Sequence, residues 1–252
     1  MSPIILQHTG KNPKLFETLN TCIQSDSASS VITAAKSFSE SVDANTESFF
    51  WEFWNDVFNA AEQIPHDHSA QDKLVAFLRE LTLQPEKSDK VWDARVWTDL
   101  PILGAAIRER LNKAYPSTQG CQSFHSFVAR LLHAGVSPGS ETTAIWMLRA
   151  ALEQEKSEDR DLMVAAMYIE YAGATLVQSL ALVPKPRLDE TMQRMLKGGD
   201  LWDGESGLTV ERWMFWGKRF RELGDGKTGE AKDAALRAAG LIDMWNATRL
   251  NT

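Results

Sequence analysis

Apolar residues recur along most of the chain at intervals of three and four positions, the spacing that places them on one face of an α-helix. The clearest case is the segment 46–63, which carries Phe49, Phe50, Phe53, Trp54, Val57 and Phe58. We interpret this stripe as a buried helix face and not as a cofactor box, because aromatic residues at helical spacing are what a helical core needs.

The same spacing predicts about ten helices, with Asn12 capping the first ahead of Pro13 and Asp67 or Ser69 capping the fourth. The predicted segments are 12–24, 28–40, 46–63, 69–82, 102–111, 120–134, 140–155, 159–182, 188–197, 209–223 and 228–249. With only 15 glycines and 9 prolines among 252 residues, hairpin turns are scarce. We therefore expect an all-α fold, a single compact non-repeating domain over residues 1–252, with the helices of 12–40 at its periphery.

The apolar run 162–183 is long enough to cross a bilayer, but Glu170 lies at its centre, where a charge is costly. We interpret the run as a central buried helix. Helical geometry places Glu170 in the apolar stripe, so its carboxylate must pair with Arg130, Arg149 or Arg212, or stay protonated as a pocket acid/base. The structural ion pair and the pocket acid remain alternatives.

Charge and cysteine content narrow the partners and the compartment. The chain has 27 Lys and Arg against 34 Asp and Glu, a net charge of −7, which disfavours nucleic acids and anionic membranes. Small molecules or proteins are the expected partners, and the oligomeric state stays open. Cys22 and Cys121 cannot form a disulfide framework, and the start of the sequence shows no signal peptide, so we expect a cytoplasmic protein.

A metal site is one reading of His66, His68 and Asp72, which offer two imidazoles and a carboxylate around a helix start. The alternative is that these polar residues cap the helix. Glycine-rich segments near 198–207 and 224–226 lack the spacing of dinucleotide or phosphate loops, so the sequence predicts no cofactor. The 198–207 segment is longer than the usual helix connection, which is typical of functional or mobile loops.

A nucleophile and base pair is one reading of Cys121 and His125, which lie one turn apart at a predicted helix start. The alternative is that both flank a core stripe. Arg212 stands in the first turn of its helix, where the dipole disfavours a cation, so we expect a carboxylate from another helix to hold it and the residue to be structural.

Several segments, among them WTDLPILG at 97–104, AIWMLRAALE at 144–153 and GLTVERWMFWGKRF at 207–220, together resemble a known family. The chain is similar over residues 45–249 to the fungal proteins grouped as domain of unknown function 3632. This resemblance implies a filamentous-fungal, helical, intracellular protein with an accessory role in secondary metabolism as one alternative. The family pattern differs at Cys121 and His125, which weakens the nucleophile and base reading.

Two functional hypotheses follow. The first is a non-catalytic binding or scaffold protein, favoured by nine tryptophans and the lack of a recognisable catalytic constellation. The second is an accessory enzyme acting on a small apolar metabolite, with Glu170, Arg212 or His125 as acid/base residues. An enclosed pocket lined by Trp146, Trp213 or Trp216 and holding a buried charge would favour the second.

Overall fold

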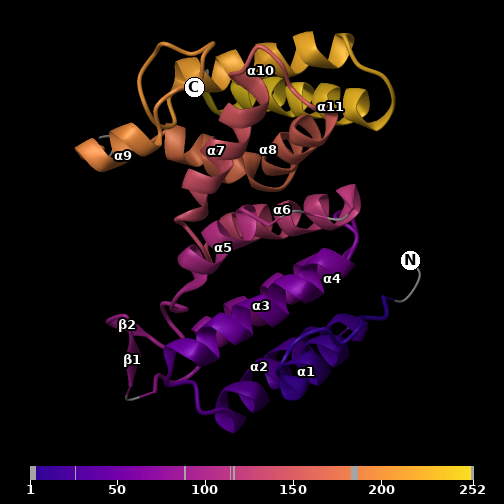
Figure 1. Ribbon diagram of the computed structural model, residues 1–252, viewed down its shortest axis with the longest axis vertical. Coiled ribbons are helices and arrows are strands. Elements are labelled where there is room, and N and C mark those ends of the chain that lie inside the picture. Colours follow the sequence, from indigo (N-terminus) through magenta and orange to yellow (C-terminus); the bar gives the residue numbers. More distant parts are fainter. Residues whose placement is uncertain are drawn as a thin grey trace. The chain divides into compact units, whose positions relative to one another are not determined.

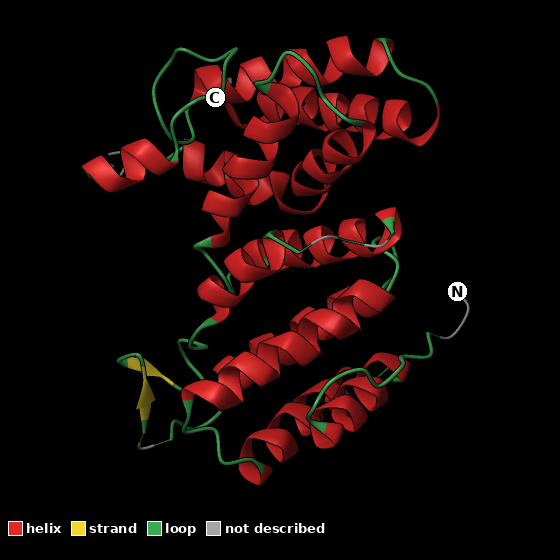
Figure 2. Cartoon of the chain, in the orientation of Figure 1, coloured by secondary structure: helices red, strands yellow, loops and turns green. Residues whose placement is uncertain are grey.

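The computed structural model describes residues 4–25, 27–87, 89–113, 115, 117–182 and 187–250. It is 67% helical, and its only strands in these ranges are two strands of two residues each, which form one hairpin (Figure 2). This confirms the all-α prediction. The chain divides into two compact units, Met1–Ser137 and Pro138–Thr252, which are described separately below. The single-domain organisation stays a prediction. Val183, the last residue of the predicted apolar run 162–183, lies outside the described residues.

Unit 1 consists of six helices and a hairpin (Figure 1). The elements are α1 (Pro13–Gln24), α2 (Ala28–Ser41), α3 (Glu47–Gln63), α4 (Ala70–Thr82), β1 (Lys90–Val91), β2 (Ala94–Arg95), α5 (Leu103–Leu111) and α6 (Thr118–His133). Asn12 caps α1 by accepting from the Leu15 N–H at 2.9 Å, as predicted. The cap of α4 differs from the prediction, because His68 Nδ1 accepts the Ala70 N–H at 3.1 Å while Ser69 makes no side-chain cap bond.

The core of unit 1 is the aromatic face of α3, which packs against α1, α5 and α6. Phe49 of the predicted stripe is only half-buried, but eight other aromatic residues of this core are fully buried and contact one another's rings. They are Phe38, Phe50, Phe53, Trp54, Phe58, Phe77, Trp97 and Phe124. The wide stripe of segment 46–63 is therefore a core face, as its spacing indicates.

The hairpin was not predicted from the sequence. β1 and β2 pair antiparallel, with Val91 opposite Ala94. The two residues between them, Trp92 and Asp93, have φ values of 53° and 59°. Positive φ at both positions defines the type I′ turn that joins tightly twisted strands, here without glycine.

The described part of unit 2 contains α7 (Ser140–Leu152), α8 (Asp159–Leu180), α9 (Glu190–Met195), α10 (Val210–Asp225), α11 (Gly229–Trp245) and a short π-helix, Asn246–Leu250. α8 and α10 both pack against α11, and α7 packs against α8 and α10. Thr209 caps α10 by accepting the Arg212 N–H at 3.1 Å. Among the described helices, none combines the length and the apolar character needed to span a membrane.

Candidate functional site

Arg212 is fully buried at the start of α10 and is paired with Glu153, the residue that ends α7. Its Nε lies 2.6 Å from Glu153 Oε1, and its Nη2 lies 3.0 Å from Oε2. Nη1 donates to the carbonyls of Leu196 at 2.7 Å and Gly207 at 2.9 Å. The prediction that a carboxylate outside the helix holds Arg212 is confirmed, although the sequence did not identify Glu153.

Glu153 has no spare acceptor for a substrate. Besides Arg212, its Oε1 accepts the Trp216 indole N–H at 2.7 Å, and its Oε2 accepts the Gly199 N–H at 2.7 Å. The Arg212 carbon Cζ also lies 5.3 Å from the centre of the Trp216 ring. The strong donors and acceptors of Arg212 and Glu153 are thus all used within unit 2, where the cluster joins the end of α7, the start of α10 and the loop before α10.

The glycine-rich loop 198–207 is folded onto the same cluster. Leu201 N donates to the Glu153 carbonyl at 3.0 Å, and the Trp202 indole donates to the Glu205 carbonyl at 3.1 Å. A Cβ on Gly199 would lie 2.7 Å from the Glu153 carbonyl oxygen, closer than side chains tolerate. The glycine therefore allows a close approach of two backbones, and the loop is anchored at both ends by Arg212.

The tryptophans predicted as ligand contacts are mostly core residues. Trp213 and Trp216 have no exposed surface, and the Trp213 indole donates to Asn246 Oδ1 at 3.0 Å. Trp146 is half-buried and donates to the Met195 carbonyl at 3.1 Å. None of the three lines one of the three cavities described here, so these cavities do not supply the enclosed tryptophan pocket that would have favoured the enzyme hypothesis.

Glu170 is exposed on α8, and no described cation forms an ion pair with it. Both predictions for this residue, a buried ion pair and a pocket acid, are therefore wrong. The segment 162–183, which contains Glu170, is rich in alanine, and of its alanines Ala181 is exposed and Ala174 only half-buried. Alanine carries too little apolar area to decide which helix face is buried.

Cys121 and His125 both lie on α6 and are both buried. The His125 ring centre lies 5.5 Å from that of Phe124, within the core of unit 1. Neither residue lines one of the described cavities. This placement fits the core alternative better than a nucleophile that meets substrate.

Two of the three predicted metal ligands, Asp72 and His68, make other contacts. Asp72 is exposed and pairs with Arg130, whose Nε lies 2.8 Å from Asp72 Oδ1. His68 caps α4, and His66 is half-buried. Across the described ranges of the chain, no group of three His, Cys, Asp or Glu side chains is placed to hold a metal ion. The capping alternative accounts for His68.

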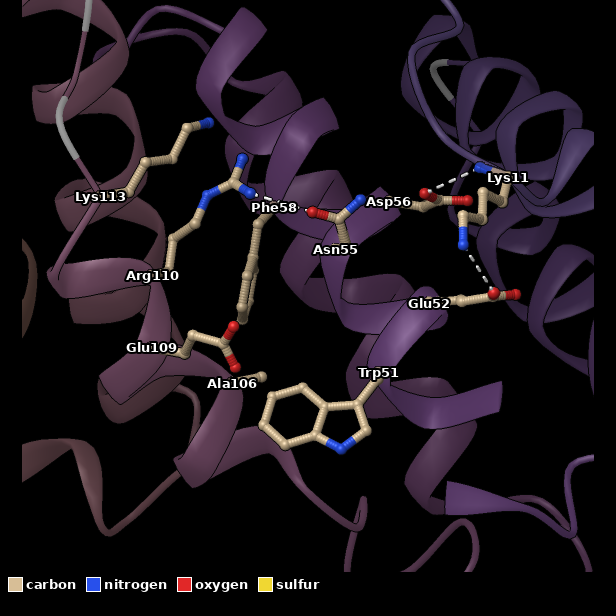
Figure 3. Close-up of a pocket in the computed structure, with 10 residues that line it drawn as sticks. All are labelled: Lys11, Trp51, Glu52, Asn55, Asp56, Phe58, Ala106, Glu109, Arg110 and Lys113. Atoms are coloured by element: carbon tan, nitrogen blue, oxygen red, sulfur yellow. Dashed lines mark hydrogen bonds and ion pairs between the residues drawn. The ribbon is translucent and has the colours of Figure 1, made fainter. Parts of the chain in front are cut away.

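A pocket that the sequence did not predict lies between α3 and α5 of unit 1 (Figure 3). Its volume is about 480 Å³, within the usual range for small-molecule sites. Apolar and charged side chains line it: Lys11, Trp51, Glu52, Asn55, Asp56, Phe58, Ala106, Glu109, Arg110 and Lys113. Ala106, Glu109 and Arg110, at i, i+3 and i+4 of α5, supply one wall together with Lys113, which follows the helix. The facing wall comes from α3, so the pattern of one helix does not identify the whole set.

Arg110 is held rigidly at one end of this pocket. Its Nε lies 2.6 Å from Glu62 Oε1, and its two Nη atoms donate to the side-chain oxygens of Asn55 at 3.1 Å and Asn59 at 2.6 Å. Lys113 Nζ lies 3.3 Å from the other Glu62 oxygen. The side chains of Asn55, Asn59 and Glu62 on α3 thus hold the Arg110 guanidinium in one position at the pocket.

The segment before α1 closes another side of the pocket. Asp56 is buried on α3 and accepts the backbone N–H groups of Lys11 at 3.2 Å and Asn12 at 2.9 Å. Lys11 Nζ in turn lies 3.2 Å from Glu52 Oε1. Asp56 therefore anchors the irregular segment before α1, and these hydrogen bonds explain why a carboxylate is buried on α3.

At the opposite end, one carboxylate links two indoles. Trp51 Nε1 donates to Glu47 Oε1 at 3.1 Å, and Trp92 Nε1 donates to Glu47 Oε2 at 2.9 Å. The two rings meet edge to face with centres 6.3 Å apart. These two hydrogen bonds hold the pKa of the Glu47 carboxyl below its usual value, and the bond from Trp92 has the larger effect.

A second cavity, of about 560 Å³, lies within unit 2 among the ends of α7, α8 and α9 and the loop before α10. Its lining includes the four leucines Leu182, Leu188, Leu196 and Leu208, together with Glu141 and Glu205. Its floor is shared with the ion-pair cluster, because Leu196 and Gly207 bind Arg212 through their carbonyls.

A family profile described as "Protein of unknown function (DUF3632)" matches residues 54–220. The chain belongs to the DUF3632 family. This confirms the predicted family, over a shorter range than the predicted 45–249. No curated protein and no solved structure matches the chain.

Within this DUF3632 protein, the Arg212–Glu153 pair and the α5 wall of the unit 1 pocket lie inside the matched region. Lys11, Trp51 and Glu52 precede it, so that the pocket combines residues from inside and outside the region that defines the family.

Proposed function

We propose that this DUF3632 protein is a non-catalytic binding protein that holds a small molecule in the pocket between α3 and α5. The observation that carries the proposal is the combination, in one cavity of about 480 Å³, of apolar surface from Trp51, Phe58 and Ala106 with a rigidly held Arg110. Small-molecule sites typically consist of such an apolar surface with a few fixed polar groups.

The state of the charged groups supports binding over catalysis. Around the pocket, Arg110, Lys113 and Lys11 are each paired with a carboxylate. In unit 2 the buried pair of Arg212 and Glu153 is saturated by internal hydrogen bonds. Groups committed to such bonds orient a ligand well but transfer protons poorly, because catalysis needs a group poised to change its protonation state.

The test is a fragment screen by saturation-transfer NMR on the wild-type protein and on two variants of α5. Ala106 lines the pocket, so Ala106→Leu fills it, whereas Ala105 is half-buried beside it and does not line it. We expect fragments whose signal is lost in Ala106→Leu and kept in Ala105→Leu. If all bound fragments behave alike in the two variants, the α3–α5 pocket is not the ligand site. Thermal melting of both variants controls for folding.

A second candidate function is an accessory enzyme or binding protein of fungal secondary metabolism that takes an apolar metabolite. The cavity of unit 2, with four leucines in its lining, favours this alternative. Cys22 and Cys121 are both buried and are not joined in a disulfide, which fits a reducing cytoplasm as the compartment for either function. Deletion of the gene in its host, followed by metabolite profiling, separates the two: a lost or accumulated metabolite supports the pathway role, and an unchanged profile opposes it.

A further inference from the structure

The two ends of the α3–α5 pocket differ in charge (Figure 3). Arg110 and Lys113 lie at one end, where Glu62 pairs with both. The Glu109 carboxylate lies at the other end, on the same side as the Trp51 indole. We call this second part the Trp51 end.

At the Trp51 end, the Glu109 carboxylate carries a negative charge that no described side chain of the pocket neutralises. It is exposed, and no cation in the described part of the chain forms an ion pair with it. Lys113 follows four residues later, just past the end of α5, and its Nζ binds Glu62. The carboxylate is therefore open to a cation that comes from outside the chain.

The orientation of the Trp51 ring suits the same ligand. Its N–H is fixed by Glu47, and Figure 3 shows the indole nitrogen pointing away from Ala106 and Glu109. Trp92, bound to the same carboxylate, supports the ring edge to face. The indole N–H is thus already used by Glu47 and is not offered to the pocket, whose lining includes the Trp51 ring. A tryptophan face attracts cations more strongly than other aromatic faces do.

We propose that the ligand of this pocket is an organic ammonium ion, whose cationic head lies against Trp51 and opposite the Glu109 carboxylate. This inference rests on the proposed function, because it names the ligand class of the same pocket. An organic head group fits better than a bare metal ion, since the described residues provide no set of three ligating side chains. The apolar surfaces of Phe58 and Ala106 then contact the carbon skeleton.

The experiment compares choline with 3,3-dimethylbutan-1-ol, a neutral molecule of nearly the same shape in which carbon replaces the nitrogen. Binding of each to the full-length protein is measured by NMR titration at low salt. We expect the neutral molecule to bind about 3- to 30-fold more weakly than choline, the range that cation–π contacts span. Equal binding of the two molecules would overturn the inference, because shape alone would then account for recognition.

Three variants locate the effect. Trp51→Leu keeps apolar bulk and removes the π face, so the affinity for choline should fall to about that of the neutral molecule, which is itself little affected. Glu109→Gln, at an exposed position that the fold does not need, should weaken choline several-fold and reduce its salt dependence. Glu40→Gln removes an exposed carboxylate of α2 that does not line the pocket and should change nothing.

The outcomes separate this inference from the proposed function. If fragments bind the pocket but choline neither binds nor competes with them, the proposed function stands and the ammonium ligand is wrong. If no fragment is displaced by filling the pocket with Ala106→Leu, both are wrong. If Trp51→Leu does not fold, Glu109→Gln decides alone: unchanged choline affinity in that variant contradicts the role of the carboxylate.

Discussion

The Arg212 guanidinium and the Glu153 carboxylate meet through two hydrogen bonds, of 2.6 and 3.0 Å, with neither side chain exposed to solvent. Burying two charges costs several kcal/mol per ion. The attraction between the two charges offsets this cost only if every remaining donor and acceptor of the pair is also hydrogen-bonded. Trp216, Gly199 and the carbonyls of the 196–207 segment provide those bonds. The pair therefore fixes the end of α7, the start of α10 and the loop between α9 and α10 in one arrangement.

Replacing Arg212 with lysine should destabilise the protein by about 2–4 kcal/mol, because an ammonium group cannot keep the two-point contact and both carbonyl bonds. Urea unfolding followed by circular dichroism measures the loss. Arg160→Lys is the matched control in unit 2, since Arg160 is exposed and its pairs with Glu158 and Asp161 lie on the surface. The control should change stability by less than about 0.5 kcal/mol. A similar small change for Arg212→Lys would contradict the structural role.

Removing both partners should cost less than the sum of removing each alone. Arg212→Met leaves a buried carboxylate without its cation, and Glu153→Met leaves a buried guanidinium without its anion, at about 3–5 kcal/mol each. The double variant contains neither orphaned charge, so its loss should fall short of the sum by at least about 2 kcal/mol. A double-mutant cycle by urea unfolding measures this difference. Additive losses would mean that the two residues act independently.

Two helical glycines should respond to alanine in opposite directions. A Cβ on Gly217 of α10 would lie 2.8 Å from Ile242 Cγ2 of α11, so Gly217→Ala should destabilise the helix pair by about 1–3 kcal/mol. A Cβ on Gly240 of α11 meets no atom within 4 Å, so Gly240→Ala should stabilise by about 0.5–1 kcal/mol through helix propensity. Thermal unfolding checks both signs. Destabilisation by Gly240→Ala would contradict the open surroundings of that residue.

Helical periodicity predicted the elements of the fold well, because each signal lies within one helix. The 46–63 stripe became α3, and Asn12 before Pro13 became the cap of α1. The prediction of a helix over 140–155 ran three residues too long, since Glu153 leaves the helix at φ −107°. At that position the carboxylate meets Arg212, 59 residues away, and no local pattern contains that information.

The candidate site was harder to predict because it depends on the packing of helices. Glu109 and Arg110 line the pocket from α5, but the facing residues come from α3 and from the segment that Asp56 anchors before α1. The placement of Glu170 failed for a related reason: its helix is rich in alanine, and alanine fits both a surface and a core. The sequence predicted that Arg212 needs a partner, since the helix dipole disfavours a cation there, but not which residue supplies it.

Cys22 should resist alkylation in the folded protein. Burial raises the pKa of its thiol to about 11, despite the nearby Lys73, so little thiolate is present at about pH 8. Iodoacetamide labelling followed by peptide mass spectrometry should find Cys22 unmodified until urea is added. Cys121 is buried as well and should also react slowly. Rapid labelling of Cys121 in the folded state would instead support its pairing with His125 as an activated nucleophile.

The last prediction concerns the carboxylate that links the two indoles. Hydrogen bonds from Trp92 and Trp51 hold the pKa of Glu47 below its usual value of 4.5, so the folded state favours the charged form. The stabilisation is therefore present above pH 4.5 and is lost as the pH falls through the lowered pKa of the folded state. Near-ultraviolet circular dichroism follows the edge-to-face pair of Trp51 and Trp92 directly, and its signal should persist below pH 4.5 before it declines.

Glu47→Gln provides the control for that titration, because an amide cannot ionise and has one oxygen to accept from two indoles. The variant should show a weaker signal from the tryptophan pair at neutral pH and no acid transition assignable to position 47. Its affinity for choline should also fall, since the Trp51 ring is then less well oriented. If the variant keeps the wild-type signal and the same acid transition, Glu47 does not hold the two indoles together.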